Sequence, residues 1–145
     1  MTTPRGVRNR NPGNIDFNPR NDWQGQIGKE PGGRFAIFDT PENGIRALGK
    51  LLMNYRGKDG IPGVGGRGID TVLETINRWA PSNENDTQAY AAAVAKRLGV
   101  KPTDPIKIKD PAILRGMVLS IIIHENGGNP YPDQVIDEGV RRALV

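Results

Sequence analysis

Residues 112–130 read AILRGMVLSIIIHENGGNP, an apolar run that leads through one glutamate into a Gly-Gly-Asn-Pro turn. The run from Ala112 to Ile123 predicts a buried helix, and Gly127 predicts its end, because glycine is common just beyond a helix. Glu125 would then lie where a buried helix meets an open loop. Half-burial of a carboxyl group disfavours its charged form, as a general acid requires. The alternative is a solvated glutamate at an ordinary helix end.

The chain of 145 residues suits a single domain, residues 1–145, with a modest core. It has no cysteine and one histidine, His124, and it shows no metal-ligand spacing. The longest apolar stretch, Met117 to Ile123, is far shorter than the roughly 20 residues that a membrane span needs. The N-terminus lacks the apolar segment of a signal peptide. We therefore expect no disulfide, no metal, no cofactor and no membrane insertion.

The charge balance is mildly basic, with 20 Lys and Arg residues against 16 Asp and Glu residues, a net charge of +4. The basic residues are dense near the N-terminus, at Arg5, Arg8, Arg10 and Arg20. No helix-turn-helix or RNA-binding motif accompanies them, so we expect no nucleic-acid partner. A positive surface also suits an anionic polymer such as the bacterial cell wall. The commonest explanation of such residues is a solvated surface.

Apolar periodicity and capping signals predict a mainly α fold of the α+β type, with about five helices around the buried helix that ends at Glu125. The first helix begins at Pro41 after a cap at Asp39 or Thr40, and its apolar face reaches Tyr55. The others run over about 70–79, from a cap at Asn85 or Asp86 to Gly99, from Asp110-Pro111 to Glu125, and from about Asp133 to Leu144.

The first forty residues predict loops and a small β-hairpin. Residues 34–38, Arg-Phe-Ala-Ile-Phe, are the best strand candidate, and residues 14–18 are its expected partner. The glycine-rich segment 57–68 lacks the Gly-Lys-Ser/Thr ending of a phosphate-binding loop, so no nucleotide site is expected there.

Two separate patterns resemble peptidoglycan-degrading proteins. Residues 5–15, RGVRNRNPGNI, followed by Trp23-Gln24-Gly25 and then by residues 35–44, FAIFDTPENG, look like a pattern of phage-encoded proteins of this kind. The same order of an Asn-rich segment, a Trp-x-Gly and a Phe-rich strand leading into a helix is similar to the flagellar-type glucosaminidases.

Residues 125–130, ENGGNP, are similar to the Glu-Ser-Gly-x-Asn-Pro segment around the catalytic glutamate of soluble lytic transglycosylases, with Asn126 in the serine place. In that lysozyme-like superfamily the glutamate helix precedes the Asn-rich segment, whereas here it follows. We hypothesise a circularly permuted lysozyme-like domain, because the termini of compact domains often lie close together. Glu125 should then lie beside the loop from Asn11 to Ile15.

The resemblance implies a glycosidase that cuts peptidoglycan glycan strands, either a lytic transglycosylase or a lysozyme (muramidase), with Glu125 as its general acid. A hydrolase usually employs a second carboxylate, and Asp16, Asp39 and Glu42 are candidates by position. A transglycosylase works with one glutamate, because the 6-hydroxyl of the sugar itself attacks. No motif marks a second carboxylate, which slightly favours the single-acid route.

Sugars bind through aromatic stacking and through hydrogen bonds to amides. The expected substrate-binding residues are Asn11, Asn14, Trp23, Asn126 and Tyr131. The Tyr131 hydroxyl would also orient Glu125 by a hydrogen bond. The alternative for this set is turn-forming asparagines and a core tryptophan.

The expected partners are the glycan strands of bacterial peptidoglycan and other virion proteins, and the expected location is a phage virion or the host periplasm and cell wall after release. The alternative function is a non-catalytic phage structural or cell-wall-binding protein that keeps a lysozyme-like shape.

Overall fold

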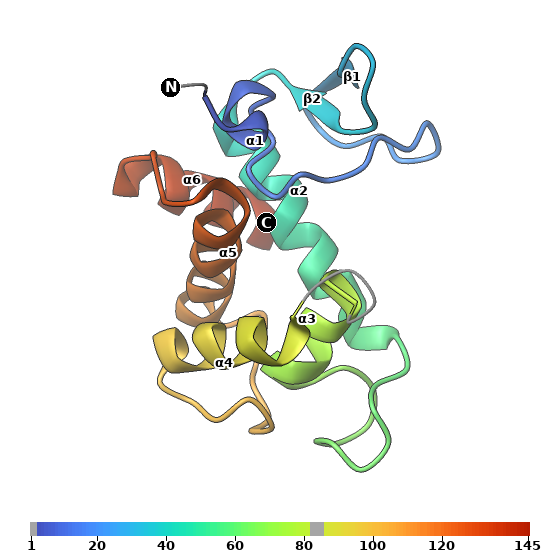
Figure 1. The fold of residues 1–145 in the computed structure, drawn as a ribbon, viewed down its shortest axis with the longest axis vertical. Helices are drawn as coiled ribbons and strands as arrows, with labels where there is room; N and C mark the ends of the chain where they lie inside the picture. The colour runs from blue at the N-terminus through green and yellow to red at the C-terminus, as the bar shows by residue number, and fades with distance from the viewer. Residues whose placement is uncertain (1–2, 82–85) are drawn as a thin grey trace. The chain divides into compact units, whose positions relative to one another are not determined.

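The computed structural model describes residues 3–81 and 86–145. Its elements are α1 (Arg5–Arg8), β1 (Gln26–Lys29), β2 (Ala36–Phe38), α2 (Pro41–Asn54), the 3-10 turn η1 (Tyr55–Gly57), α3 (Val72–Trp79), α4 (Thr87–Leu98), α5 (Pro111–Asn126) and α6 (Asp133–Leu144) (Figure 1). The predicted class, mainly helical with a small antiparallel sheet near the N-terminus, is confirmed.

The chain forms two compact units. One unit combines residues Met1–Lys50 with Ile121–Val145, and the other consists of Leu51–Ser120. Both ends of the chain therefore belong to the same unit, which also contains the Asn11–Ile15 loop and Glu125. The expectation of one domain over residues 1–145 stays a prediction.

The predicted helix starts are found where the capping residues indicated. The Thr40 hydroxyl accepts a hydrogen bond from the Asn43 backbone N–H at the start of α2, at 3.2 Å. Asp86 caps α4 in the same way through the Ala89 backbone N–H, whereas the alternative cap, Asn85, lies outside the described residues. Helix α4 ends at Gly99, whose φ of 74° is the left-handed conformation typical of a helix end.

The core of the unit with both chain ends is built from α2, α5, α6 and the end of β2. Its fully buried side chains include Phe38, Ile45, Leu48, Ile122 and Ile136. Helix α6 lies close to α2 because Gly139 has no side chain: a Cβ there would come within 2.4 Å of the Ile45 side chain. The apolar spacing of these helices therefore produced the expected buried faces.

The other unit contains α3 and α4. Thr71 caps the start of α3, because the Glu74 backbone N–H donates to the Thr71 hydroxyl, and that hydroxyl in turn donates to the Glu74 carboxylate. Val72 and Ile76 are fully buried, while Leu73 and Trp79 are half-buried. The buried side chains of α3 therefore pack within this unit.

The small sheet differs in part from the prediction. Strand β2 pairs with β1 in an antiparallel hairpin, and Phe35 makes a separate bridge with Asp16 from the expected partner segment. Neither β1 nor α1 was predicted. Strand β1, Gln-Ile-Gly-Lys, offers one β-branched residue and contains a glycine, and α1 is a single turn, too short for apolar periodicity to mark it.

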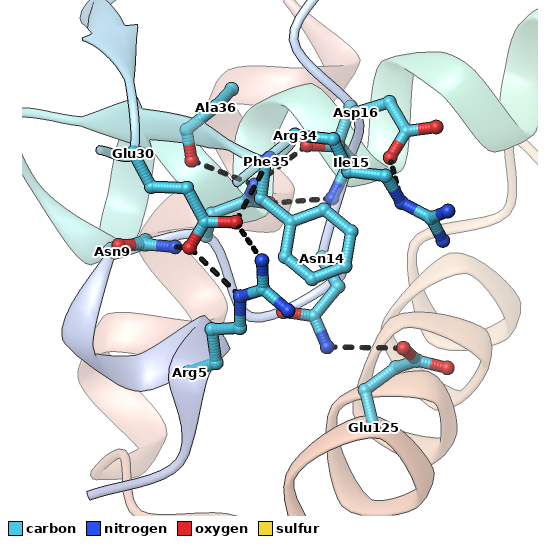
Figure 2. Close-up of polar contacts among 11 residues, drawn as sticks. Arg5, Asn9, Asn14, Ile15, Asp16, Glu30, Arg34, Phe35, Ala36 and Glu125 are labelled. Atoms are coloured by element: carbon cyan, nitrogen blue, oxygen red, sulfur yellow. Dashed lines mark hydrogen bonds and ion pairs between the residues drawn. The ribbon is translucent and has the colours of Figure 1, made fainter. Parts of the chain in front are cut away.

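A partly buried ion pair joins α1 to the hairpin. The Glu30 carboxylate is 4% exposed and accepts hydrogen bonds from two nitrogens of Arg5, from the Asn9 amide at 3.0 Å and from the Phe35 backbone N–H at 3.1 Å (Figure 2). The Arg5 guanidinium also lies 4.4 Å from the centre of the Phe35 ring. The hydrogen bonds from Arg5, joined by those from Asn9 and Phe35, lower the pKa of Glu30 to about 2.

The low pKa of Glu30 predicts an acid-sensitive contribution to stability. A carboxylate with a depressed pKa in the folded state stabilises the fold above its ordinary value of 4.5, and this contribution is lost as the pH falls toward 2. At neutral pH we expect the Glu30→Gln protein to melt at a lower temperature than the wild-type protein. Between pH 4.5 and pH 2 its melting temperature should change less than that of the wild-type protein. Thermal melts followed by circular dichroism measure both.

Glu138→Gln is the matched control. Its carboxylate pairs with Arg141 and Arg142 and also has a pKa lowered to about 2, but the group is more exposed to solvent, which weakens such pairs. An equal loss in both variants would contradict the special role of the Glu30 network.

Candidate functional site

Glu125 lies in the last turn of α5 and is half-buried. The Asn14 side-chain amide donates a hydrogen bond to its Oε1 atom at 3.1 Å (Figure 2). The two residues are 111 positions apart in the sequence. The expected closeness of Glu125 to the loop from Asn11 to Ile15 is therefore confirmed.

Asn14 is held in place by the backbone of its own loop. Its φ of 51° is left-handed, a conformation that asparagine tolerates better than most residues. On the next residue, the Ile15 backbone N–H donates to the Asn11 side-chain oxygen at 3.0 Å, while the Asn11 amide donates to the carbonyls of Ile15 and Ala36, both at 2.9 Å. The loop thus presents the Asn14 amide to Glu125 from a rigid backbone.

The same bonds define what Asn11 does. Its side chain is fully buried and is bonded to three backbone groups. A side chain in that position has no surface to offer a sugar. Asn11, predicted as a substrate-binding residue, is instead a residue that holds the Asn14 loop against the hairpin.

Asn126 ties the end of α5 to the same loop. Its side-chain amide donates to the Pro12 carbonyl at 2.8 Å and to the Ile122 carbonyl at 2.9 Å. Its side-chain oxygen is buried, as is that of Asn14, and neither oxygen has a hydrogen-bond partner within the described part of the chain. Asn126 therefore positions the helix end beside the loop.

Gly6 explains how these two asparagines fit together. A Cβ on this residue would lie 2.7 Å from the Asn126 side-chain oxygen, 2.8 Å from the Asn11 carbonyl and 2.9 Å from the Asn14 side-chain oxygen. Helix α1 brings the bare Cα of Gly6 against all three oxygens. This positioning residue was not predicted, although it lies inside the Asn-rich motif of residues 5–15.

The two predicted aromatic residues, Trp23 and Tyr131, are both half-buried. The Trp23 Nε1 atom and the Tyr131 hydroxyl are buried and have no hydrogen-bond partner among the described residues. The expected hydrogen bond from Tyr131 to Glu125 is therefore wrong, and burial raises the pKa of Tyr131 to about 12. Contact of either ring with a sugar stays a prediction.

The three candidate second carboxylates occupy different places. Asp16 is exposed and pairs with Arg34, whose Nε lies 3.1 Å from its Oδ1 atom. Asp39 accepts a hydrogen bond from the Asn43 amide at 2.9 Å, and this bond lowers its pKa. Glu42 lies half-buried in the first turn of α2.

A cavity of about 350 Å³ opens beside the end of α5. It is lined by Thr3, Pro4, Val7, Asn126, Gly128, Asn129 and Pro130. Within residues 3–81 and 86–145, no group of three or more His, Cys, Asp or Glu side chains is placed to hold a metal ion, and no helix is long and apolar enough to cross a membrane.

Comparison with known proteins places this chain beside a phage protein. Protein P5 of Pseudoalteromonas phage PM2 is 35% identical to this chain over 138 residues, which cover 93% of this chain and 79% of the relative. The chain belongs to the protein P5 family. No protein-family model matches it. The phage origin of this relative agrees with the resemblance of residues 5–15 to a pattern of phage-encoded proteins.

Substitution of Gly6 tests the packing that positions Asn14 and Asn126. The Cβ of Gly6→Ala collides with three oxygens that belong to the loop and the helix end, so we expect a loss of about 1–3 kcal/mol in the free energy of unfolding, as for other overpacked sites. Chemical denaturation measures this loss.

Gly57→Ala is the control, because a Cβ at Gly57 meets nothing within 4 Å. Equal stability of the Gly6→Ala and wild-type proteins would show that the loop does not depend on this contact.

Proposed function

We propose that the protein is a glycosidase that cleaves peptidoglycan glycan strands, acting as a lysozyme or a lytic transglycosylase with Glu125 as the general acid. The observation that carries the proposal is the hydrogen bond between Asn14 and Glu125. It joins the two halves of the sequence pattern that resemble the lysozyme-like superfamily, although they are far apart in the chain.

The arrangement suits proton delivery to a glycosidic oxygen. Glu125 stands half-buried at a helix end, with Asn14 bonded to Oε1, which leaves Oε2 as the oxygen that carries the proton. The acid gives that proton to the leaving oxygen as the bond to the anomeric carbon breaks. The Asn14 amide fixes the carboxyl plane, and orientation of this kind is a large part of general acid catalysis.

Family membership and charge support the choice of substrate. The relative is a phage protein, and a phage must breach the peptidoglycan of its host during entry or release. The net charge of +4 favours approach to the anionic cell wall. Within this proposal the protein acts from the virion or at lysis, and its partners are glycan strands and other virion proteins.

The decisive experiment compares the wild-type protein with Glu125→Gln on purified peptidoglycan, with released muropeptides analysed by mass spectrometry. The amide keeps the size and the hydrogen-bonding shape of the side chain but has no proton to deliver. We expect release by the wild-type protein and a loss of about 10²–10⁴-fold in rate for Glu125→Gln, the usual worth of a general acid.

Glu138→Gln, which changes a glutamate on α6, serves as the control and should cleave at the wild-type rate. Unchanged cleavage by Glu125→Gln would refute the role of this residue. No release by any of the folded proteins would favour a structural or wall-binding role instead.

A further inference from the structure

We infer that Asp16 is the second carboxylate of the site and that the protein is a hydrolase, which adds water to the glycosidic bond. This inference rests on the proposed function. Of the three carboxylates that the sequence leaves open, Asp16 lies on the segment that contacts Glu125. It would act as the base that activates the attacking water.

The backbone places Asp16 close to the acid. Asp16 follows Asn14 by two residues, so their Cα atoms are separated by at most about 7 Å. Hydrogen bonds hold Ile15, the residue between them. The Asn11 side chain bonds both the N–H and the carbonyl of Ile15, and the same carbonyl also accepts from the Ala36 backbone N–H at 3.0 Å. Asp16 itself bridges to Phe35. Hydrogen bonds therefore hold the backbone between Asn14 and Asp16 in place.

The side chain of Asp16 points to the surface. Ile15 is 6% exposed and faces the core, whereas the neighbouring Asp16 side chain is 64% exposed, because successive side chains of a strand face opposite sides. Figure 2 shows that Asp16 extends from the same segment as Asn14, whose side-chain amide contacts Glu125. Carboxyl groups of inverting glycosidases stand about 6.5–9.5 Å apart, which leaves room for a water molecule.

Arg34 is the charged partner of this carboxylate, with its Nε atom 3.1 Å from the Asp16 Oδ1 atom. The ion pair between Arg34 and Asp16 is exposed on both sides, so it adds little to stability. The Arg34 guanidinium also lies 5.3 Å from the centre of the Phe35 ring, and Phe35 is the bridge partner of Asp16. The Asp16 carboxylate is therefore a surface group beside Arg34 that the fold does not need for stability, and it is open to solvent water.

The other two candidates are placed less well. The Asp39 carboxylate is bonded to Asn43 at the start of α2, and its Oδ1 lies 2.4 Å from where a Cβ on Gly25 would stand. Glu42 belongs to the first turn of α2. Neither residue lies on the segment that carries Asn14.

The reaction balances with water as the only co-reactant. The Asp16 carboxylate takes a proton from water as the water oxygen forms a bond to the anomeric carbon. The bond from that carbon to the glycosidic oxygen breaks, its electron pair stays on the oxygen, and the Glu125 carboxyl group supplies the proton. Glu125 is left as a carboxylate and Asp16 as an acid, and exchange with solvent restores both.

The test digests peptidoglycan in water enriched in ¹⁸O and compares the wild-type protein with Asp16→Asn and with Asp22→Asn, an exposed aspartate of the same loop region. We expect wild-type products with a reducing end that contains one ¹⁸O atom. We expect Asp16→Asn to be slower by about 10²–10⁴-fold, with an unchanged melting temperature, and Asp22→Asn to behave as wild type.

Anhydro-sugar products from the wild-type protein would overturn the role of Asp16 while leaving the proposed function in place. Wild-type rates for Asp16→Asn would overturn it as well. Absence of any cleavage by the wild-type protein would overturn both the proposed glycosidase function and the role of Asp16. Cleavage of the glycan strand therefore distinguishes failure of the Asp16 role alone from failure of both proposals.

Discussion

The hydrogen bond between Asn14 and Glu125 is the contact on which the candidate site depends. It links the first segment of the chain to a helix that ends near the last, so neither half of the pattern forms a site alone. Its geometry requires the Asn14 loop to be rigid, because a flexible loop would let the amide leave the carboxylate. The surrounding polar contacts serve that requirement.

Two groups of interactions make the loop rigid. Asn11 and Asn126 bond backbone groups on either side of it, and Gly6 allows α1 to approach both. Farther out, the Arg5 and Glu30 pair fastens α1 to the hairpin, with the Phe35 ring beneath the guanidinium. Buried hydrogen-bond networks favour one conformation over alternatives, and this matters in a glycine- and proline-rich segment with little regular structure.

Sequence patterns predicted the helices well and the first forty residues only in part. Caps such as Thr40 and Asp86 act within one turn, so the sequence alone reveals them. Arg5 and Glu30 are 25 residues apart, and no local pattern announces such a pair. In the site, Glu125 lies beside the Asn11–Ile15 loop as predicted, whereas Asn11 proved to be buried and Tyr131 lacks its expected bond to Glu125. A sequence motif shows which residue types are present, but tertiary packing decides where each side chain points.

The most direct test is a crystal structure of the Glu125→Gln protein with a peptidoglycan tetrasaccharide. We predict a glycosidic oxygen within hydrogen-bond distance of the side chain at position 125, with the Asn14 amide still in contact with that side chain and the Asp16 carboxylate facing the anomeric carbon. A saccharide bound elsewhere on the protein, or an Asn14 loop that moves away from position 125 when the saccharide binds, would contradict it.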